Sequence, residues 1–409
     1  MTQRVVITGM GALTSLGATV PEFWSAVRAG QCGIAPIRAY DTSSMAAKLA
    51  AEVSFDPAQA LAPGDMRKMD RYTQLAVIAA REAVADSGIT ADNTDFNRVD
   101  VIASSGIGGM ATTTREYSRG MDRGFDKISP FYIPMTIANI AAARISTEHG
   151  LHGDSSCIVT ACASSNHAIG EAMRHIRHGY ADAVVCGGSE AVVIPLAVGG
   201  FTSMQALHLG ADPTRASIPF DAERSGFVMG EGAGMLVLES LENAQARGAH
   251  IYAEVAGFGA TCDAYHLTAP EPNATGTTAA MMRALQDADL TPADISYLNA
   301  HGTSTPLNDK SEVLAIHKVF GQHTTLPVSS SKSMTGHLLG AAGAIEAIIC
   351  TCAVVDAFIP PTINYRVPDP ECDIDVVPNT GRPAALSAVM SNTFGFGGHN
   401  ASLVITRMD

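Results

Sequence analysis

Short apolar runs typical of buried strands alternate along this chain with longer segments that have the period of a helix. The apolar runs lie at residues 5–8, 99–103, 183–186, 235–238, 251–259 and 295–298. Helical segments are expected at residues 19–30, 65–87, 166–173, 241–247, 276–287 and 338–355. Strands that alternate with helices at this spacing predict an α/β sheet, because each helix covers the strands that it connects.

Glycine-rich stretches follow several of the predicted strands. Residues 9–14, after the first strand, superficially match a dinucleotide-binding loop, but Thr14 occupies the third glycine position. No acidic residue closes a second strand about 20 residues later, so a nicotinamide site is disfavoured. The stretch Ser-Ser-Gly-Ile-Gly-Gly at residues 104–109 lets the backbone approach either a ligand or another subunit.

The length and charge of the chain limit which domain organisations and which kinds of partner are compatible with it. At 409 residues it is long enough for two or three domains, or for two halves that share one large core. No repeat is visible by residue identity, so only the recurring order of strands and helices suggests a duplication. The net charge of −14 argues against nucleic acid or an anionic membrane as the main partner. An acidic partner therefore needs a local basic patch, and Arg67, Lys68 and Arg71 form either such a patch or a solvated helix face.

The cysteines and the apolar stretches indicate where the protein works. Eight cysteines occur without a regular framework and without a Cys-x-x-Cys pair, so neither a zinc site nor a redox motif has support. The N-terminal apolar run is too short for a signal peptide. The longest apolar stretch, residues 340–358, is interrupted by Glu346 and Asp356 and does not read as a membrane span. We therefore expect a cytoplasmic protein with reduced thiols.

Cys162 is the first candidate for chemistry. It follows the apolar, β-prone pair Ile158 and Val159 and precedes a segment of helical period. A cysteine on such a strand-to-helix turn lies near a helix N-terminus, where free N–H groups and the helix dipole favour the thiolate. The local sequence leaves two interpretations open, a nucleophile and a buried inert cysteine.

Two histidines occupy similar junctions in the second part of the chain. His301 follows a predicted strand, and His337 precedes the helix predicted at 338–355, five residues after Lys332. At a helix N-terminus the pKa of His337 is expected to be low, which keeps the imidazole neutral at pH 7. Glu346, inside the same apolar helix, must be paired, hydrogen-bonded or near a cation.

A glycine-rich connection at residues 391–400 joins two strand-like runs near the C-terminus. Glycines on both sides of Phe396 permit unusual backbone angles. Bare N–H groups in this connection could bind a developing oxyanion, although an ordinary hairpin connection would have the same composition.

Four motifs resemble those of the β-ketoacyl-acyl-carrier-protein synthases, most closely the synthase II branch of fatty-acid elongation. They are Thr-Ala-Cys-Ala-Ser-Ser at 160–165, Asn-Ala-His-Gly-Thr at 299–303, Lys-Ser-Met-Thr-Gly-His at 332–337 and Asn-Thr-Phe-Gly-Phe-Gly-Gly at 392–398. The resemblance extends from Val5 to Ile405 and implies the thiolase fold, an α/β architecture of two similar halves in five layers, α-β-α-β-α. We expect the halves at residues 1–250, with the nucleophile, and 251–409, with the histidines.

The resemblance implies an acyltransferase that lengthens fatty acids by two carbons through a decarboxylative Claisen condensation. Cys162 would accept the acyl group from the phosphopantetheine of an acyl carrier protein. His301 and His337 would serve the decarboxylation of malonyl-carrier and stabilise the enolate, and Lys332 would organise the charges. The backbone N–H groups of Cys162 and Phe396 would form the oxyanion hole, and Phe396 would also act as a gate.

Further expectations from the resemblance concern binding and assembly. Thr303 and Thr305 resemble pantetheine contacts, and Ile107 and Phe201 resemble the lining of an acyl pocket. The residues that correspond to a monovalent-cation site, for Na⁺ or K⁺, are Asn299, Glu346, Ser391 and Asn392. The family needs no redox cofactor and forms homodimers. Docking of the acidic carrier would involve Arg67, Lys68 and Arg71.

Two positions depart from the family pattern. His399 stands where many members have threonine, which leaves the catalytic assignment intact. The loop after Met204, residues 205–212, lacks the arginine that many bacterial members use to hold the acidic carrier. Carrier docking would therefore rest more on the basic residues at 67, 68 and 71.

Three other functions share part of this sequence pattern. A polyketide ketosynthase would carry out the same chemistry on the carrier of another pathway, and the sequence separates the two poorly. A degradative thiolase would have a second cysteine near the C-terminal glycine loop, where this chain has His399. A non-catalytic subunit that only sets chain length would lack the nucleophile that Cys162 provides.

Overall fold

The computed structural model describes residues 3–408, which form two α/β halves with the same order of strands. The first half contains β1 (Val5–Leu13), β4 (Val99–Ser104), β5 (Ser155–Ser156), β6 (Ala183–Glu190) and β7 (Gly232–Ser240). The second contains β8 (Ala253–Cys262), β9 (Ile295–Asn299), β10 (Val328–Ser329), β13 (Ala388–Gly395) and β14 (His399–Arg407). Two short pairs lie apart from these strands, β2 (Ala35–Pro36) with β3 (Leu49–Ala50) and β11 (Phe358–Ile359) with β12 (Arg382–Pro383).

The two halves are equivalent strand for strand. In hydrogen-bonding order the first reads β5-β4-β6-β7-β1 and the second β10-β9-β13-β14-β8. In each half the first three strands of this order are parallel and the last two run antiparallel to their neighbours. β1 and β8 pair antiparallel, with Val6 opposite Glu254 and Ile7 opposite Ala253, which joins the halves into one ten-stranded sheet. The duplication that the element order suggested is present in the topology.

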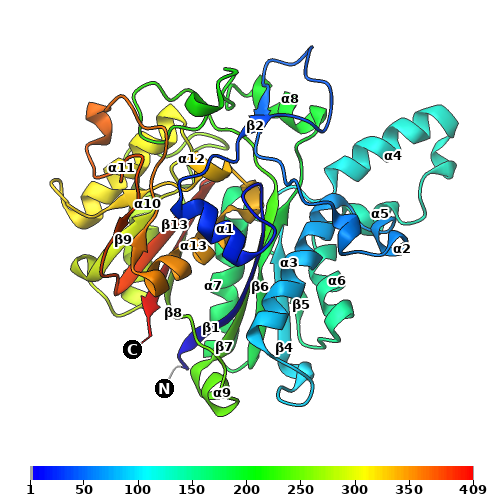
Figure 1. The fold of residues 1–409 in the computed structure, drawn as a ribbon, viewed down its shortest axis with the longest axis horizontal. Helices are drawn as coiled ribbons and strands as arrows, with labels where there is room; N and C mark the ends of the chain where they lie inside the picture. Colours follow the sequence, from blue (N-terminus) through cyan, green and yellow to red (C-terminus); the bar gives the residue numbers. More distant parts are fainter. Residues whose placement is uncertain (1–2, 409) are drawn as a thin grey trace.

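Helices cover the strands in three layers (Figure 1). α3 (Arg71–Ser87) and α6 (Ile140–His149) pack on the outer face of the first half, and α10 (Thr275–Asp287) and α11 (Pro306–Phe320) on that of the second. α7 (Ser164–Arg177) and α13 (Ala342–Asp356) lie between the two halves of the sheet and contact each other. This is the five-layered arrangement expected of the thiolase fold.

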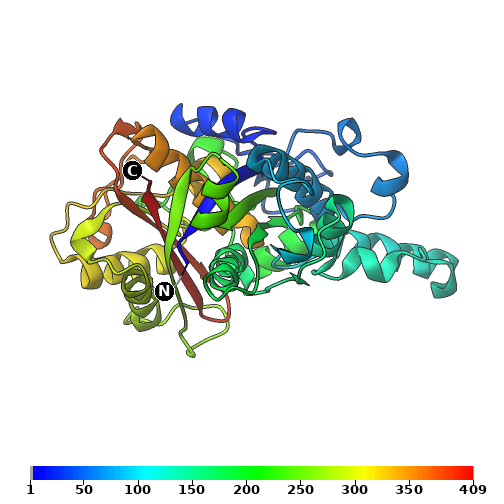
Figure 2. The same cartoon turned by 90° about the horizontal axis from the view of Figure 1, so that it is seen from below.

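One helical unit projects from the body of the molecule. α4 (Met110–Arg123) and α5 (Tyr132–Thr136) extend away from the sheet in both Figure 1 and Figure 2. The unit carries several large apolar side chains that are more than two-fifths exposed, namely Tyr117, Met121, Phe125, Phe131, Ile133 and Ile137. A group of this kind on one protrusion is typical of a surface that another protein covers.

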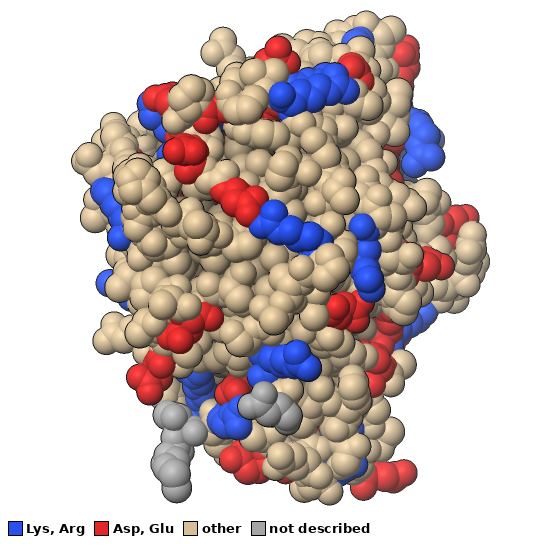
Figure 3. Space-filling model, turned by 60° about the vertical axis from the view of Figure 1, so that its left-hand side comes forward, with Lys and Arg blue, Asp and Glu red and all other residues tan. Residues whose placement is uncertain are grey.

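Charged side chains are dispersed over the surface in Figure 3. On this face Lys and Arg side chains alternate with Asp and Glu and form no continuous basic area. The remaining short helices are α1 (Val20–Arg28), α2 (Pro63–Met66), α8 (Pro195–Ser203), α9 (Leu241–Ala246) and α12 (Lys332–Thr335), of which α12 is fully buried.

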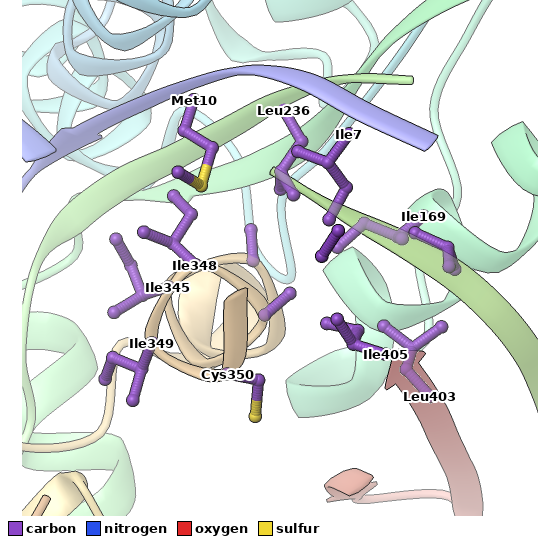
Figure 4. Close-up of a cluster of buried hydrophobic side chains, with 14 of the residues drawn as sticks. Ile7, Met10, Ile169, Leu236, Ile345, Ile348, Ile349, Cys350, Leu403 and Ile405 are labelled. Atoms are coloured by element: carbon purple, nitrogen blue, oxygen red, sulfur yellow. The ribbon is translucent and has the colours of Figure 1, made fainter. Parts of the chain in front are cut away.

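The central core lies between the two halves of the sheet, around α13. Figure 4 shows Ile345, Ile348 and Ile349 of this helix among apolar side chains from both halves. Strands buried on both faces are apolar at successive positions, as the continuous runs in the sequence indicated. The segment Leu339–Asp356 is long and apolar enough to cross a membrane, but 89% of it is buried inside the protein. It is therefore a core helix, and its apolar character reflects its central place in the fold.

The glycines at residues 9–14 serve packing. They belong to β1, whose outer face is covered by α3. A Cβ at Gly9 would clash with the carbonyl oxygen of Ala83, and one at Gly11 with that of Ala79. The glycines let a helix lie directly on the strand, which explains why this stretch superficially matched a dinucleotide loop.

Three boundaries expected from the sequence were wrong. The helix expected from Asp65 is divided, and α3 begins only at Arg71 because the Asp70 side chain accepts a hydrogen bond from the Tyr72 N–H and caps it. No strand forms at residues 157–160, just before Cys162. α13 begins at Ala342, four residues later than expected, because a 3₁₀ turn at Leu339–Ala341 precedes it.

Candidate active site

A cavity of about 550 Å³ brings residues from both halves together. Cys162 from the first half lines it together with His301 and His337 from the second. Other expected site residues that line the cavity are Phe201, Thr303, Thr305 and Phe396. The structure therefore gathers expected site residues up to 234 positions apart in the chain around one cavity.

Cys162 lies in a 3₁₀ turn, Ala161–Ala163, directly before α7. Ala161 has φ 51°, a left-handed conformation that costs free energy for any residue with a Cβ. Ser164 locks the turn, because its hydroxyl accepts from the Thr160 N–H (2.9 Å) and donates to the Ala161 carbonyl (2.6 Å). The sharp turn holds the thiol at the cavity wall, where 8% of the residue is exposed.

The electrostatics of Cys162 differ from the sequence-based expectation. Burial raises the pKa of the thiol to about 12, against the opposing effect of the Lys332 charge. The negative charge of Glu190 raises this pKa further, and the backbone N–H groups of Phe396 and Cys162 lower it. The expectation that the helix N-terminus favours a resting thiolate was wrong, because desolvation outweighs the favourable charges and N–H groups. The resting group is a thiol.

His301 follows β9 and is anchored through its backbone. Its N–H and that of Gly302 donate to the two carboxylate oxygens of Glu312, at 2.9 and 2.8 Å. The ring packs nearly perpendicular to that of His337, with centroids 5.2 Å apart. Burial, followed by the charge of Lys332, holds the pKa of His301 well below its ordinary value, so the imidazole is neutral at pH 7.

His337 is oriented by the turn that follows it. Its N–H donates to the Val228 carbonyl (2.7 Å), and the Leu339 N–H donates to its Nδ1 (3.3 Å). Because Nδ1 accepts a hydrogen bond, the ring proton is on Nε2, which is left as a donor. The low pKa expected for His337 is confirmed, but its causes are burial and then the charge of Lys332.

Lys332 lies behind the cavity wall and forms a buried ion pair with Glu346. The side chains are 1% and 2% exposed, so Glu346 is paired as its apolar surroundings required. Around this pair, among the described residues, several buried polar atoms have no hydrogen-bond partner: Glu346 Oε2, Ser391 Oγ and both side-chain amide atoms of Asn299. The unpartnered oxygens of Asn299, Ser391 and the single carboxylate Glu346 are the kind of ligands that a monovalent cation binds. Asn392 differs, because its Oδ1 accepts from the Ser402 hydroxyl (2.8 Å).

The connection expected at 391–400 is shorter than predicted, because β13 runs to Gly395 and β14 begins at His399, which leaves only residues 396–398 as the turn between them. Gly397 and Gly398 have φ 86° and 75°, as a tight reversal requires. At Gly395 a Cβ would lie 2.8 Å from the Thr160 carbonyl and 3.0 Å from the Cys162 nitrogen, so only glycine lets the turn reach the nucleophile. This close approach brings the Phe396 N–H to the thiol, where it acts on the thiol pKa together with the Cys162 N–H.

Aromatic rings connect Phe396 to His337 along the cavity. Phe396 and Phe201 have ring centroids 6.4 Å apart, Phe201 and Phe227 5.4 Å, and Phe227 and His337 5.3 Å. Ile107 does not line the cavity, but it packs in the same apolar cluster as Cys162. A displacement of the Phe396 ring would therefore change the packing of the wall beside the thiol.

The remaining expected residues lie at the cavity mouth and on the surface. Thr303 and Thr305 line the cavity and share a hydrogen bond between their hydroxyls (2.9 Å). The basic residues at 67, 68 and 71 do not line it. Arg67 is exposed, Lys68 lies over the ring of Phe131, and Arg71 forms hydrogen bonds of 2.6 and 2.9 Å with Glu231.

Glu312 is a site residue that the sequence reasoning did not single out. It lies on α11, is fully buried, lines the cavity and fixes the backbone of His301. Burial raises the pKa of Glu312 to about 7, against the hydrogen bonds from the backbones of Gly302 and His301. A signal was present in the sequence, because Asp309 and Glu312 fall on the helix face that also carries Ile316.

Comparison with known proteins points to one family. Two family models match the chain, "Beta-ketoacyl synthase, N-terminal domain" at residues 2–244 and "Beta-ketoacyl synthase, C-terminal domain" at residues 252–366. A curated relative from Synechocystis sp., named "3-oxoacyl-[acyl-carrier-protein] synthase 2", is 46% identical over 408 residues, which cover 99% of this chain and 98% of the relative.

Solved structures agree with this comparison. "The ishigamide ketosynthase/chain length factor" matches with a TM-score of 0.94 and 37% identity, over the full length of both chains. The complex "AntDE:AntF (apo): type II PKS acyl-carrier protein in complex with its ketosynthase bound to the hexaketide" matches with a TM-score of 0.93 and 34% identity, again over the full length of both chains.

Proposed function

The chain belongs to the β-ketoacyl synthase family, and from this premise we propose that it is a 3-oxoacyl-[acyl-carrier-protein] synthase that lengthens acyl chains by two carbons. The observation that carries the proposal is the convergence of Cys162, His301 and His337 on one cavity. The reaction needs a nucleophile that forms a thioester and a carbanion made without a strong base, and this set of groups supplies both.

The first step transfers the acyl group to Cys162. The sulfur attacks the carbonyl carbon of the acyl-pantetheine thioester, the bond to the pantetheine sulfur breaks, and the thiol proton ends on the released carrier. The carbonyl oxygen becomes negative in the tetrahedral intermediate, and the N–H groups of Cys162 and Phe396 act as its donors. The charge of Lys332 offsets part of the free-energy cost of burying the thiolate that forms during the attack, because it lowers the pKa of the thiol.

The second step condenses the bound acyl group with malonyl-carrier. Loss of CO₂ leaves an electron pair on the carbon next to the malonyl thioester, and the thioester oxygen takes up the charge as an enolate. His337 donates from Nε2, because its Nδ1 accepts from Leu339, and neutral His301 is the second histidine at the cavity. The enolate carbon attacks the acyl carbonyl, the bond to Cys162 breaks, and the sulfur takes up a proton as the 3-oxoacyl carrier leaves.

A fatty-acid carrier is the substrate we favour over a polyketide carrier. The chain is 46% identical to the Synechocystis relative named as a 3-oxoacyl-[acyl-carrier-protein] synthase, but 34% identical to the ketosynthase in the type II PKS complex above. An acyl-carrier protein, of a type II PKS, is bound to the ketosynthase in the AntDE:AntF complex, which supports a carrier protein as the partner of this chain. We also propose that the protein works in the cytoplasm, as its eight unpaired cysteines favour.

Intact-protein mass spectrometry tests this function. After incubation with acyl-carriers of several chain lengths, the wild-type chain should gain the mass of an acyl group, and Cys162→Ala should not. Addition of malonyl-carrier should remove the adduct and yield a carrier-bound product two carbons longer. Failure to form an adduct with any carrier overturns the proposal, whereas an adduct with polyketide carriers alone favours the other pathway.

We propose that Arg67 and Lys68 contribute to docking of the acidic carrier. Both are exposed. Arg71 is held by Glu231, so its charge is already paired. The double variant Arg67→Glu/Lys68→Glu should bind the carrier more weakly and with less dependence on salt. Surface plasmon resonance at two ionic strengths measures this, with Arg38→Glu, on a separate exposed loop, as the control. Unchanged affinity at low salt rules the patch out.

A monovalent cation beside Glu346 is also proposed, and no redox cofactor. The buried unpartnered oxygens of Asn299, Ser391 and Glu346 support the site. K⁺ or Na⁺ should raise the thermal midpoint relative to choline at equal ionic strength, since a ligand that binds only the folded state stabilises it. Ser391→Ala should reduce that difference. An equal midpoint in all three salts argues against the cation.

We further propose a homodimer that covers the projecting unit of α4 and α5. The exposed apolar side chains there, among them Ile133 at 62% and Met121 at 65%, support it. Sedimentation velocity should give twice the mass of the chain, and Ile133→Glu should shift the protein towards the monomer. A wild-type monomer at micromolar concentration contradicts this proposal.

A further inference from the structure

Glu190, the last residue of β6, is a fully buried carboxylate beside the site, and the mechanism above does not use it. Its Oε1 accepts hydrogen bonds from the Ser105 hydroxyl (2.8 Å) and the Ile107 N–H (3.2 Å). Its Oε2 accepts from the N–H groups of Gly106 (2.8 Å) and Gly340 (3.1 Å). Three of these donors belong to the loop after β4 in the first half, and the fourth precedes α13 in the second half.

Burial raises the pKa of Glu190, and the four hydrogen bonds donated to its carboxylate oppose this effect and favour the ionised form. The Ser105 hydroxyl accepts from the Gly108 N–H (3.0 Å), which leaves its own proton for Glu190. All four contacts are thus donated to the carboxylate, and a protonated carboxyl would set its proton against one of them. Glu190 also lies close to the turn that carries Cys162, because a Cβ at Gly106 would be 2.8 Å from Glu190 Oε2 and 3.4 Å from the Ala161 carbonyl oxygen. Its charge raises the pKa of the Cys162 thiol.

Glu190 also lies between two strained turns. Ala161, with φ 51°, precedes Cys162, and Leu339, with φ 49°, precedes Gly340. Left-handed residues with a Cβ persist only where their surroundings hold them. The Glu190–Gly340 hydrogen bond holds the second turn, and Leu339 in that turn lines the cavity and orients His337 through its N–H.

We propose that Glu190 is a positioning residue that ties the loop of Ile107 to the turn of Leu339 and thereby sets the shape of the acyl pocket and the orientation of His337. Through its charge it also sets the reactivity of Cys162. The part that concerns the acyl pocket rests on the proposed function, whereas the effect on the thiol does not.

Glu190→Gln tests the proposal, because it keeps the size, removes the charge and turns one acceptor into a donor that faces an N–H group. Alkylation of Cys162 by iodoacetamide near pH 8 should become about threefold faster, which corresponds to a fall of about half a unit in the thiol pKa. The kcat for condensation should fall by at least about tenfold through misplacement of His337, and the ratio of acylation rates for short and long acyl-carriers should change.

Three variants serve as controls. Glu239→Gln makes the same change at a buried carboxylate of β7, which is paired with Arg247, and should leave the alkylation rate unaltered. Glu190→Asp keeps the charge but shortens the side chain, so it should preserve the alkylation rate and change the acyl-length ratio. Ser105→Ala removes one donor to Glu190 and keeps the charge, so it should also preserve the alkylation rate and change the acyl-length ratio. If Glu190→Gln does not fold, Ser105→Ala takes its place as the test.

The outcomes separate the two proposals. A folded Glu190→Gln with the wild-type alkylation rate, or with the wild-type acyl-length ratio, overturns the role of Glu190. If Glu190→Gln does not fold, a wild-type acyl-length ratio in Ser105→Ala does so. A wild-type chain that forms no acyl adduct overturns the proposed function instead, and the alkylation rates then still decide whether Glu190 acts on the thiol.

Discussion

Cys162 lies where influences of opposite sign act on one sulfur atom. Burial and Glu190 disfavour the thiolate, and Lys332 and two backbone N–H groups favour it. Burial dominates and raises the pKa to about 12, so the group is a thiol at neutral pH. This differs from a cysteine activated mainly by a helix N-terminus, whose pKa would lie below the ordinary value.

The rate of Cys162 alkylation should therefore rise about tenfold per pH unit between about pH 7 and 9, with no plateau. The pKa of about 12 lies above this range, so the thiolate fraction follows the hydroxide concentration. Iodoacetamide labelling followed by peptide mapping measures the rate for Cys162 separately from the exposed Cys262. A plateau near neutral pH would show that the thiolate is already formed at rest.

Replacement of Lys332 should show the cost of an unpaired buried charge. Lys332→Met leaves Glu346 without its counter-ion and should lower the free energy of unfolding by about 3–5 kcal/mol. Burial holds the pKa of Glu346 above its ordinary value, so the carboxyl contributes stability when protonated and loses it as pH rises. The deficit should therefore be smaller at low pH than at neutral pH.

Urea unfolding at two pH values measures this deficit. The double variant Lys332→Met/Glu346→Leu, in which no charge is left unpaired, should recover part of the loss. A double variant as unstable as the single one would mean that Lys332 contributes mainly through packing.

At the scale of elements, the fit between α3 and β1 depends on glycine. A Cβ at Gly11 would meet the backbone of Ala79 in α3, and backbone yields less easily than a side chain. Gly11→Ala should therefore cost about 1–3 kcal/mol of stability. Gly64→Ala is the matched control, because nothing lies within 4 Å of its Cβ position. Thermal unfolding of the two variants measures the difference, and equal midpoints would contradict the packing role.

The sequence predicted these elements better than their ends. The period of apolar residues runs unbroken from Leu338 into α13, so nothing in it marked the 3₁₀ turn that delays the helix to Ala342. The strand expected before Cys162 failed because the apolar pair Ile158 and Val159 lies outside the sheet. In both cases the departure lies beside the active site, where local preference gives way to the geometry of the site.

The whole molecule shows what residue patterns could and could not predict. The motifs predicted that Cys162, His301 and His337 belong to one site, because each keeps a recognisable neighbourhood in the sequence, and all three line the same cavity. Glu190 and Glu312 escaped notice because most of their partners are backbone N–H groups, and one of the donors to Glu190 lies 150 positions away. The duplication was visible only in the order of the strands and helices. Packing constrains that order more strongly than it constrains the identity of the side chains in each half.

The two halves should not fold independently. The central core draws residues of α7 and α13, and strands of both halves, into one apolar cluster. A fragment of residues 1–250 or 251–409 would expose its side of this core to water, so neither should unfold cooperatively, and both should bind the dye ANS. Calorimetry of the intact chain should show a single transition. A sharp transition of its own in either fragment would contradict this expectation.

The two strained turns have a consequence for stoichiometry. They occupy equivalent places in the duplicated halves, each directly before a central helix, and Gly340 stands where the other has Cys162. A side chain at Gly340 would run into the backbone of Gly106, and the N–H that corresponds to an oxyanion donor is already taken by Glu190. The pseudo-twofold symmetry of the chain is thus broken at its centre. The proposed acylation is therefore expected at Cys162 alone, and not at the equivalent position in the second half.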